Sequence, residues 1–230
     1  MSLRIILVRS VFYDRRILTN LRRKVRIKLI LDALLFSLSF NLDNIVVGTA
    51  YGIKKIKIGV FANLIIAIVT SVGTYLSMSA GTYISKFLPD SSANIVGALA
   101  VGLLGLYFII QSVIKLMKNT KPKELALKDV ADMMEYAEES DLNRNGKVDK
   151  KEALLVGLGL MLNNLGTGIT ASIANVNVPL TTIATFIVSI LTLLLGEAVG
   201  NHALGKLFGK YAPLFSGVLL VILGIFEYYH

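Results

Sequence analysis

The stretch Leu42-Asp43-Asn44-Ile45-Val46-Val47-Gly48 places a carboxylate and a carboxamide inside an apolar run. A related stretch, Leu162-Asn163-Asn164-Leu165-Gly166-Thr167-Gly168, follows about 120 residues later. A charged side chain at the centre of a membrane helix costs about 2.5 kcal/mol or more on insertion scales, so it is rarely retained there without a function. A polar site that is repeated within apolar helices is typical of transporters built from two related halves.

The composition is that of an integral membrane protein. The chain has 230 residues, is 54% hydrophobic and has a mean hydropathy of +0.68. Three windows contain no Asp, Glu, Lys or Arg, namely 58–85, 91–114 and 153–196. Each is longer than the about 20 residues that a helix needs to cross the hydrocarbon, and the last is long enough for two crossings. We therefore expect an all-α, multi-pass protein of the cell membrane, with the lipid bilayer as its partner.

The apolar windows predict six transmembrane helices in two groups of three. The expected spans are 29–52, 58–80, 93–114, 153–174, 180–200 and 211–229. They divide the chain into an N-terminal arm (1–28), a first three-helix repeat (29–114), a charged loop (115–152) and a second three-helix repeat (153–230). Glycines match between the repeats, as Gly48 with Gly168, Gly97 with Gly217, and Gly105 with Gly224 after a slip of one residue. Because each half holds an odd number of spans, related halves must be inverted in the membrane.

The net charge of +9 is concentrated in the arm, where residues 1–28 contain nine Lys or Arg and one acidic residue. Since the rest of the chain is close to neutral, the charge does not indicate a nucleic-acid surface. It favours a basic amphipathic helix on anionic lipid, and a true start near Val25 is the alternative. The lysines of the remaining loops place the loop 115–152 in the cytoplasm by the positive-inside rule. The sequence leaves open whether the protein forms a homo-oligomer.

The charged loop contains a calcium-binding pattern. Residues 141–152 fit the motif D-x-[DN]-x-[DN]-G-x5-E at every required position. The predicted Ca²⁺ ligands are the side chains, and at position seven the backbone carbonyl, of Asp141, Asn143, Asn145, Lys147, Asp149 and Glu152. Gly146 would allow the sharp turn, Val148 would make a short β contact, and residues 124–140 would form the preceding helix. The alternative is an Asx-rich turn ahead of a helix N-terminus, where Asp and Asn are favoured without a metal.

The two repeated pairs predict a second site near the bilayer midplane. If the repeats are inverted, Asp43, Asn44, Asn163 and Asn164 present one carboxylate and three carboxamides to the same region. Oxygen ligands of this kind suit hard divalent cations, including Mn²⁺. Further oxygens are available from Ser37, Asn41, Thr70 and Thr167. The alternative for the three asparagines is hydrogen bonding between helices, worth about 0.6 kcal/mol per pair.

The chain resembles the manganese efflux pump (MntP-like) family in its six predicted spans in two halves, in its repeated polar pair, and in the stretch Ser39-Phe40-Asn41-Leu42-Asp43-Asn44. The calcium-like loop before the fourth span is more similar to one branch of this family, that of the sporulation membrane protein YtaF. The resemblance covers roughly residues 29–229 and implies that Asp43 takes part in moving Mn²⁺. The acids that the pumps carry in the fourth and second spans are replaced here by Asn163 and Thr70.

Two functions follow from these observations. The first is a divalent-cation (Mn²⁺) efflux transporter that binds its ion at the midplane, between the first and fourth spans. The alternative is a non-transporting, sporulation-type membrane protein whose loop senses Ca²⁺. An enzyme is not expected, because no nucleophile, base and orienting group occur at a recognisable spacing.

Overall fold

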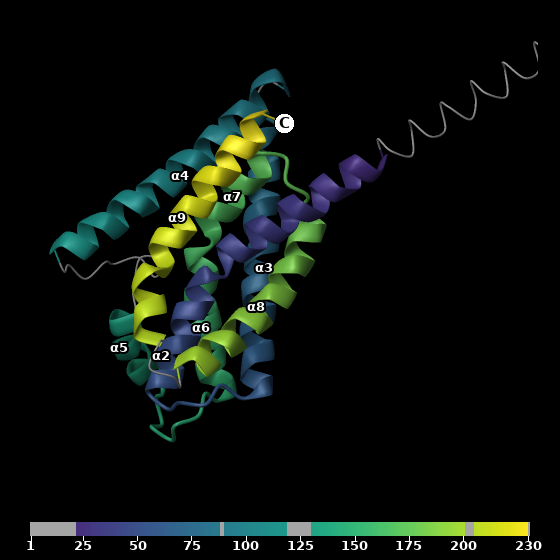
Figure 1. Ribbon diagram of the computed structural model, residues 1–230. Helices are drawn as coiled ribbons and strands as arrows, with labels where there is room; N and C mark the ends of the chain where they lie inside the picture. The colour runs from purple at the N-terminus through teal and green to yellow at the C-terminus, as the bar shows by residue number, and fades with distance from the viewer. Residues whose placement is uncertain (1–21, 88–89, 119–129, 201–204, 230) are drawn as a thin grey trace, which may run out of the picture.

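The computed structural model describes residues 22–87, 90–118, 130–200 and 205–229, and within these ranges nearly every residue is helical. The only β pairing described is an isolated bridge between Lys57 and Lys147. The predicted all-α class is therefore confirmed for the described residues. The helices are Arg22–Phe40, α2 (Leu42–Ile53), α3 (Val60–Ser85), α4 (Asp90–Lys118), α5 (Val130–Ser140), α6 (Lys150–Asn163), α7 (Leu165–Ile173), α8 (Val178–Gly200) and α9 (Gly205–Tyr229) (Figure 1).

Several helices are long and apolar enough to cross a bilayer. In the described residues these are Val60–Ser85, Ile95–Ile114 and Val178–Gly200. Two bent pairs raise the number of candidate spans to five, if each pair counts as one span. The described part of α9 adds a shorter apolar stretch, Gly217–Phe226. The chain is thus a multi-pass membrane protein, while the predicted total of six spans stays a prediction.

The two helices that carry the repeated pairs are broken, where the sequence analysis predicts single spans. The first bends by 40° between Arg22–Phe40 and α2, and the second by 44° between α6 and α7. The residues at the breaks are Asn41 and Asn164. Asparagine favours such positions because its short side chain can hydrogen-bond nearby backbone groups that a continuous helix would otherwise use. A hydropathy window cannot detect these breaks, since the flanking residues remain apolar.

The first helix also bears on the predicted arm. It continues without interruption from Arg22 to Phe40, so residues 22–28 are helical together with the expected first span. Residues 1–21 lie outside the described part of the chain. The boundary at residue 28 therefore stays a prediction.

Pairs of helices pack through glycines. Between α2 and α8, a Cβ added to Gly48 would lie 2.4 Å from the carbonyl oxygen of Leu193, and one added to Gly196 would lie 2.5 Å from that of Ile45. Between α3 and α7, a Cβ on Gly81 would lie 2.4 Å from the carbonyl oxygen of Ile169. Small residues allow this close approach, which drives helix association where lipid provides no hydrophobic force.

The directions of the pairs follow a regular scheme. Contact positions rise together along α2 and α8, and also along α3 and α7, so these pairs run parallel. In α4 and α9, which lie side by side in Figure 1, the contacts run in opposite directions: Gly105 meets Gly217, whereas Gly102 meets Gly224. If the two halves are exchanged, α2 corresponds to α7, α3 to α8 and α4 to α9. The α2–α8 pair then corresponds to the α7–α3 pair, and the α4–α9 pair corresponds to itself. An inverted repeat would have this property, although the repeat itself stays a prediction.

Two apolar clusters fill the bundle. One gathers the ends of α2, α3 and α6 with α5 and the loop, and includes Tyr51, Ile66, Met133, Ala137, Val148 and Leu160. The other joins Phe36 and Phe40 of the first helix to residues of α3, α4, α7 and α9. The helix expected before the calcium-like motif is confirmed in its described part, α5. Its Met133 and Ala137 are almost fully buried against the bundle.

Candidate ion-binding site and the loop beside it

The first break exposes helix ends around Asp43. The amide of Asn41 donates to the carbonyl of Leu38 at 3.1 Å, and its side-chain nitrogen donates to the carbonyl of Ser37 at 2.7 Å. Asp43 then lies in the first turn of α2 and is only 8% exposed. Its Oδ1 accepts the amide of Asn44 at 2.8 Å. The N-terminus of a helix favours a negative charge, so the first turn of α2 is a favourable position for an acidic side chain.

The second break reaches the first through one hydrogen bond. Asn164 lies between α6 and α7, is 4% exposed, and its Nδ2 donates to the carbonyl oxygen of Phe40 at 2.9 Å. Phe40 is the last residue before the first break, so its carbonyl ends a helix and lacks the usual partner within that helix. The side chain of Asn164, at the second break, therefore pairs with the backbone carbonyl that ends the helix at the first break. This contact places the two breaks against each other inside the protein.

A buried polar cluster surrounds Asn44. Its Nδ2 donates to Oδ1 of Asn41 and to Oγ of Ser189, both at 2.8 Å. Ser189 on α8 lies 3.3 Å, oxygen to oxygen, from Thr70 on α3. The Oδ1 atom of Asn44 is buried and has no hydrogen-bond partner. A buried acceptor without a hydrogen-bond partner is unusual in folded proteins and is often explained by a bound water or ion.

The predicted midplane residues have different outcomes. Asp43, Asn44 and Asn164 are buried at the two breaks, and their role in ion binding stays a prediction. Asn163 is the last residue of α6, and its side chain lies outside the described part of the structure. The alternative role for the asparagines, hydrogen bonding between helices, is observed for Asn44 and Asn164. Hydrogen bonding does not exclude ion binding, because the amide nitrogens make these bonds and the Asn44 oxygen is left over.

Sequence reasoning missed Ser189 and the carbonyl of Phe40. Ser189 follows Thr70 by 119 residues, the same offset that relates Gly105 to Gly224. Under an inverted repeat, residues related by this offset can meet at the symmetry axis. The pair could therefore have been found by aligning the halves through the second span of each. The Phe40 carbonyl gives no sequence signal, since it becomes available only through the break.

The calcium-like loop adopts the backbone that its motif predicts. Gly146 has a φ of +71°. The backbone amides of Asn145 and Gly146 donate to the two carboxylate oxygens of Asp141 at 3.2 and 3.1 Å. Side-chain oxygens of Asn143 and Asn145 accept amides two residues later, at 3.0 and 2.7 Å. Asp149 caps α6 in a capping box with Glu152, which is 1% exposed. These turns account for the sequence pattern without a metal, as the alternative reading expects.

Other properties of the loop do not favour a cation. No group of three or more His, Cys, Asp or Glu side chains that could hold a metal occurs among the residues that the structure describes. Both oxygens of Glu152 already accept backbone amides, from Asn143 at 3.4 Å and Asp149 at 2.8 Å. The Ca²⁺ assignment therefore gains no support from the acidic side chains. A carboxylate oxygen has more than one acceptor direction, so these bonds leave room for a ligand in principle.

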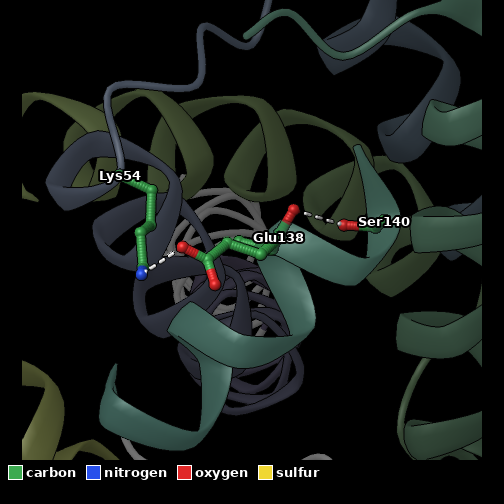
Figure 2. A network of polar contacts seen from close by, with 4 residues as sticks. Lys54, Glu138 and Ser140 are labelled. Carbon is green, nitrogen blue, oxygen red and sulfur yellow. Dashed lines mark hydrogen bonds and ion pairs between the residues drawn. The ribbon is translucent and has the colours of Figure 1, made fainter. Parts of the chain in front are cut away.

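The calcium-like loop and α5 are attached to the bundle by a backbone pairing, an ion pair and a side-chain hydrogen bond. The amide of Val148 donates to the carbonyl of Lys57, and the amide of Lys57 to that of Gly146, each at 3.0 Å. This is the predicted β contact, and its partner is the linker between α2 and α3. Lys54 at the end of α2 forms an ion pair with Glu138 on α5 (Figure 2). Tyr51 of α2 hydrogen-bonds Ser140, the last residue of α5.

The same end of the bundle is closed by apolar packing. Tyr136 of α5 packs against the cluster around Met133 and Ala137, and burial raises the pKa of its hydroxyl above the ordinary value. The group is therefore neutral at physiological pH. With α5 seated in this way, the ends of α2 and α6 are covered on the side where the sequence predicts the cytoplasm.

Comparison with known proteins agrees with these features. The family model described as "Putative manganese efflux pump" matches residues 125–226, which run from the segment before α5 into α9. The resemblance to the manganese efflux pump (MntP-like) family is confirmed. The chain is also 29% identical over 208 residues to the "Probable sporulation protein YtaF" of Bacillus subtilis (strain 168). That alignment covers 84% of this chain and 97% of the relative.

The likeness to YtaF extends the resemblance to the first half of this MntP-like chain, which the family model does not reach. No solved structure matches the chain significantly. The family is one of efflux pumps and not of enzymes, and its location in a membrane agrees with the apolar helices described above.

Proposed function

We propose that this protein is an efflux transporter for a divalent cation, with Mn²⁺ as its substrate, and that the ion binds at the two helix breaks. The observation that carries the proposal is that a hydrogen bond joins the two breaks at Phe40, three residues before the buried Asp43. Asp43 lies in the first turn of α2, and three residues earlier the Phe40 carbonyl accepts the side chain of Asn164. Discontinuous helices whose ends face a midplane site are a recurring design of secondary transporters.

The donor set fits a hard cation that must bind and leave again. Asp43 would supply the one negative charge, and Oδ1 of Asn44 a neutral oxygen that has no partner in the protein. The carbonyl end of the first helix carries the partial negative charge of its dipole and would add to the attraction. Carboxylate, amide and carbonyl oxygens are ligands that suit Mn²⁺. With few charges the affinity would be moderate, which a transported ion requires.

The proposed cycle needs two states. In the conformation described, α5 and the apolar cluster around Tyr51 and Ile66 close one end of the bundle. An inverted repeat would allow the opposite end to close instead, by rocking of one half against the other. Passage to and from the α5 end would then require α5, or the helices it covers, to separate.

The test is a flux measurement on purified protein in proteoliposomes with an Mn²⁺-sensitive dye inside. We expect Asp43→Asn to abolish flux, while Asp43→Glu, which keeps the charge on a longer side chain, retains part of it. Thermal unfolding in detergent is the control for folding. Because asparagine has nearly the same size and shape as aspartate, Asp43→Asn should unfold close to the melting temperature of the wild type if its fold is intact. Flux by Asp43→Asn equal to that of the wild type would refute the proposed site.

The second candidate is a sporulation-type membrane protein whose loop senses Ca²⁺. It is favoured by the loop's backbone, which has the turn of the motif at Gly146, and by its direct bond to the α2–α3 linker at Lys57. The likeness to a probable sporulation protein supports the sporulation part of this candidate. Ca²⁺ bound by Asp141 and Glu152 would tighten the start of α6 and so reach the second break.

Calorimetric titration of the full-length protein with Ca²⁺ tests this candidate. Glu152→Gln should abolish binding, whereas Glu139→Gln, an exposed acid just outside the motif, should leave it unchanged. Absence of binding heat in the wild type, with the same thermal stability with and without Ca²⁺, would rule out the sensor and leave Glu152 as a capping residue.

A further inference from the structure

The first half of α8 contains two buried hydroxyl groups that hydrogen-bond to nothing. Thr181 and Thr185 are both 0% exposed, and the Oγ1 atom of each lacks a hydrogen-bond partner. Burying an unpaired hydroxyl is costly, and buried polar side chains are bonded in the large majority of cases. Two such groups one turn apart on the same helix therefore call for a physical explanation.

Neighbouring threonines show that a partner was within reach. In α8 itself, Thr182 donates to the carbonyl of Val178 at 2.9 Å and Thr192 to that of Val188 at 2.8 Å. This bond to the preceding turn is the usual way in which Ser and Thr satisfy their hydroxyls in a membrane helix. The hydroxyls of Thr181 and Thr185 make no such bond. The carbonyls four residues earlier belong to Asn177, just before α8, and to Thr181.

The two hydroxyls continue a line that starts at the proposed ion site. Thr181, Thr185 and Ser189 are spaced by four residues, so they share one face of α8. Ser189 accepts the side chain of Asn44 at 2.8 Å. At a rise of 1.5 Å per residue, Thr181 lies about 12 Å from Ser189 along the helix, which is most of the about 15 Å from midplane to hydrocarbon edge. The line therefore runs from the breaks toward the Val178 end of α8.

The other half of the protein lacks this line. The offset of 119 residues that relates Thr70 to Ser189 relates Ala62 and Ile66 of α3 to Thr181 and Thr185. Ala62 and Ile66 are buried in the apolar cluster that α5 helps to form. On one side of the breaks the equivalent positions are thus apolar and sealed, and on the other they carry unpaired oxygens. Packing alone does not require this difference.

We propose that Thr181, Thr185 and Ser189 line the route along which the divalent cation, with part of its water shell, moves between the breaks and the Val178 end of α8. This inference rests on the transport function proposed above. Hydroxyl oxygens are hard, neutral ligands, so they can replace water around Mn²⁺ without holding it as a row of carboxylates would. Water molecules or the passing ion bind the hydroxyl oxygens of Thr181 and Thr185, which have no hydrogen-bond partner in the protein.

Removing one hydroxyl without changing shape separates this role from a structural one. We expect Thr185→Val to slow Mn²⁺ flux about tenfold, the effect of losing one hydrogen-bond-strength contact along the path. Thermal stability should stay equal or rise, because a buried orphan hydroxyl is removed. Thr185→Ser should retain flux. The matched control is Thr192→Val, whose hydroxyl is already bonded within the helix and whose flux should stay within about twofold of the wild type.

Water access can be measured even if Mn²⁺ is not the substrate. The chain has no cysteine, so a single introduced thiol is the only one in the protein. In proteoliposomes we expect a charged, membrane-impermeant methanethiosulfonate to modify Thr181→Cys and Thr185→Cys. Leu193→Cys, on the same helix but buried in the apolar cluster, should be inert. Mn²⁺ should slow the modification of Thr185→Cys.

The outcomes separate the two proposals. Modification of the two threonine variants no faster than that of Leu193→Cys, in a protein that transports Mn²⁺, would overturn the route and leave the transport function in place. Modification of both variants in a protein that moves no Mn²⁺ would support an aqueous route and refute Mn²⁺ as its substrate. A Thr185→Val variant with wild-type flux would also overturn the route.

Discussion

Gly48→Ala is expected to push α8 away from α2 and to disturb the ion site without touching it. The added methyl carbon would lie 2.4 Å from the carbonyl oxygen of Leu193, and carbon contacts under 3.0 Å are essentially never found. The obstructing atoms are backbone, so no side chain can rotate away. The helices must separate by about 0.6 Å to reach even the tightest tolerated contact. Overpacking of this kind costs about 1–3 kcal/mol.

The same displacement reaches the polar cluster one turn earlier. If α8 moves as a rigid body, the bond from Asn44 to Ser189 lengthens from 2.8 Å to about 3.4 Å, beyond the usual range for an N–H···O hydrogen bond. We therefore expect Gly48→Ala to lower both the melting temperature in detergent and the rate of Mn²⁺ flux.

Gly102→Ala is the matched control, because no atom lies within 4 Å of the added carbon in α4. There the substitution should stabilise the protein, by about 0.5–1 kcal/mol, since alanine loses less conformational freedom in a helix than glycine. The two variants are thus predicted to shift the melting temperature in opposite directions. Equal shifts of the same sign would refute the packing argument and the α2–α8 contact on which it depends.

Three other substitutions probe the breaks and the α5 clamp. Asn164→Ala should cost about 1–3 kcal/mol in thermal unfolding, because the buried Phe40 carbonyl loses its partner; stability equal to the wild type would contradict the contact. Tyr51→Phe removes the bond to Ser140 and should speed hydrogen exchange in α5, by about fivefold for a loss of about 1 kcal/mol, with the other helices as the internal reference. Asn163→Asp adds a second carboxylate, besides Asp43, to the proposed ion site and should lower both the KM for Mn²⁺ and the maximal flux, because a tighter site releases its ion more slowly; an unchanged KM would argue against a ligand role at this position.

The membrane class and the burial of Asp43, Asn44 and Asn164 could be inferred from the sequence, because both depend on composition and spacing. Long windows without charge can fold only as buried or membrane-embedded helices, and Asp43 stands out in such a window. The turn at Gly146 and the β contact of Val148 were also predictable, since the loop motif encodes its backbone locally. The partner of that β contact was not, because Lys57 is distant along the chain and carries no pattern that marks it.

The helix breaks were outside the reach of hydropathy, because Asn41 and Asn164 change the average of an apolar window very little. Their effect lies in hydrogen bonds that compete with the helix, and these depend on what the other half of the protein offers. The side chain of Asn164 can turn away from its own helix because it donates to the Phe40 carbonyl. That carbonyl is available because the first helix ends at Phe40, just before Asn41. The hydrogen bond that joins the two breaks links residues 124 positions apart, so it could not be inferred from the neighbours of either break.

The two sides of the breaks differ in a way that suggests which end the described conformation closes. On the α5 side, the positions equivalent to the hydroxyl line are the apolar residues Ala62 and Ile66, which are buried in the cluster that α5 helps to form. On the Val178 side, Thr181 and Thr185 offer oxygens that the fold leaves unpaired. An ion at Asp43 would therefore meet less resistance toward the Val178 end, because leaving toward α5 requires apolar side chains to separate. If the protein exports its ion as proposed and α5 faces the cytoplasm, this conformation would follow loading, and the contacts of Lys54 and Tyr51 with α5 would stabilise it.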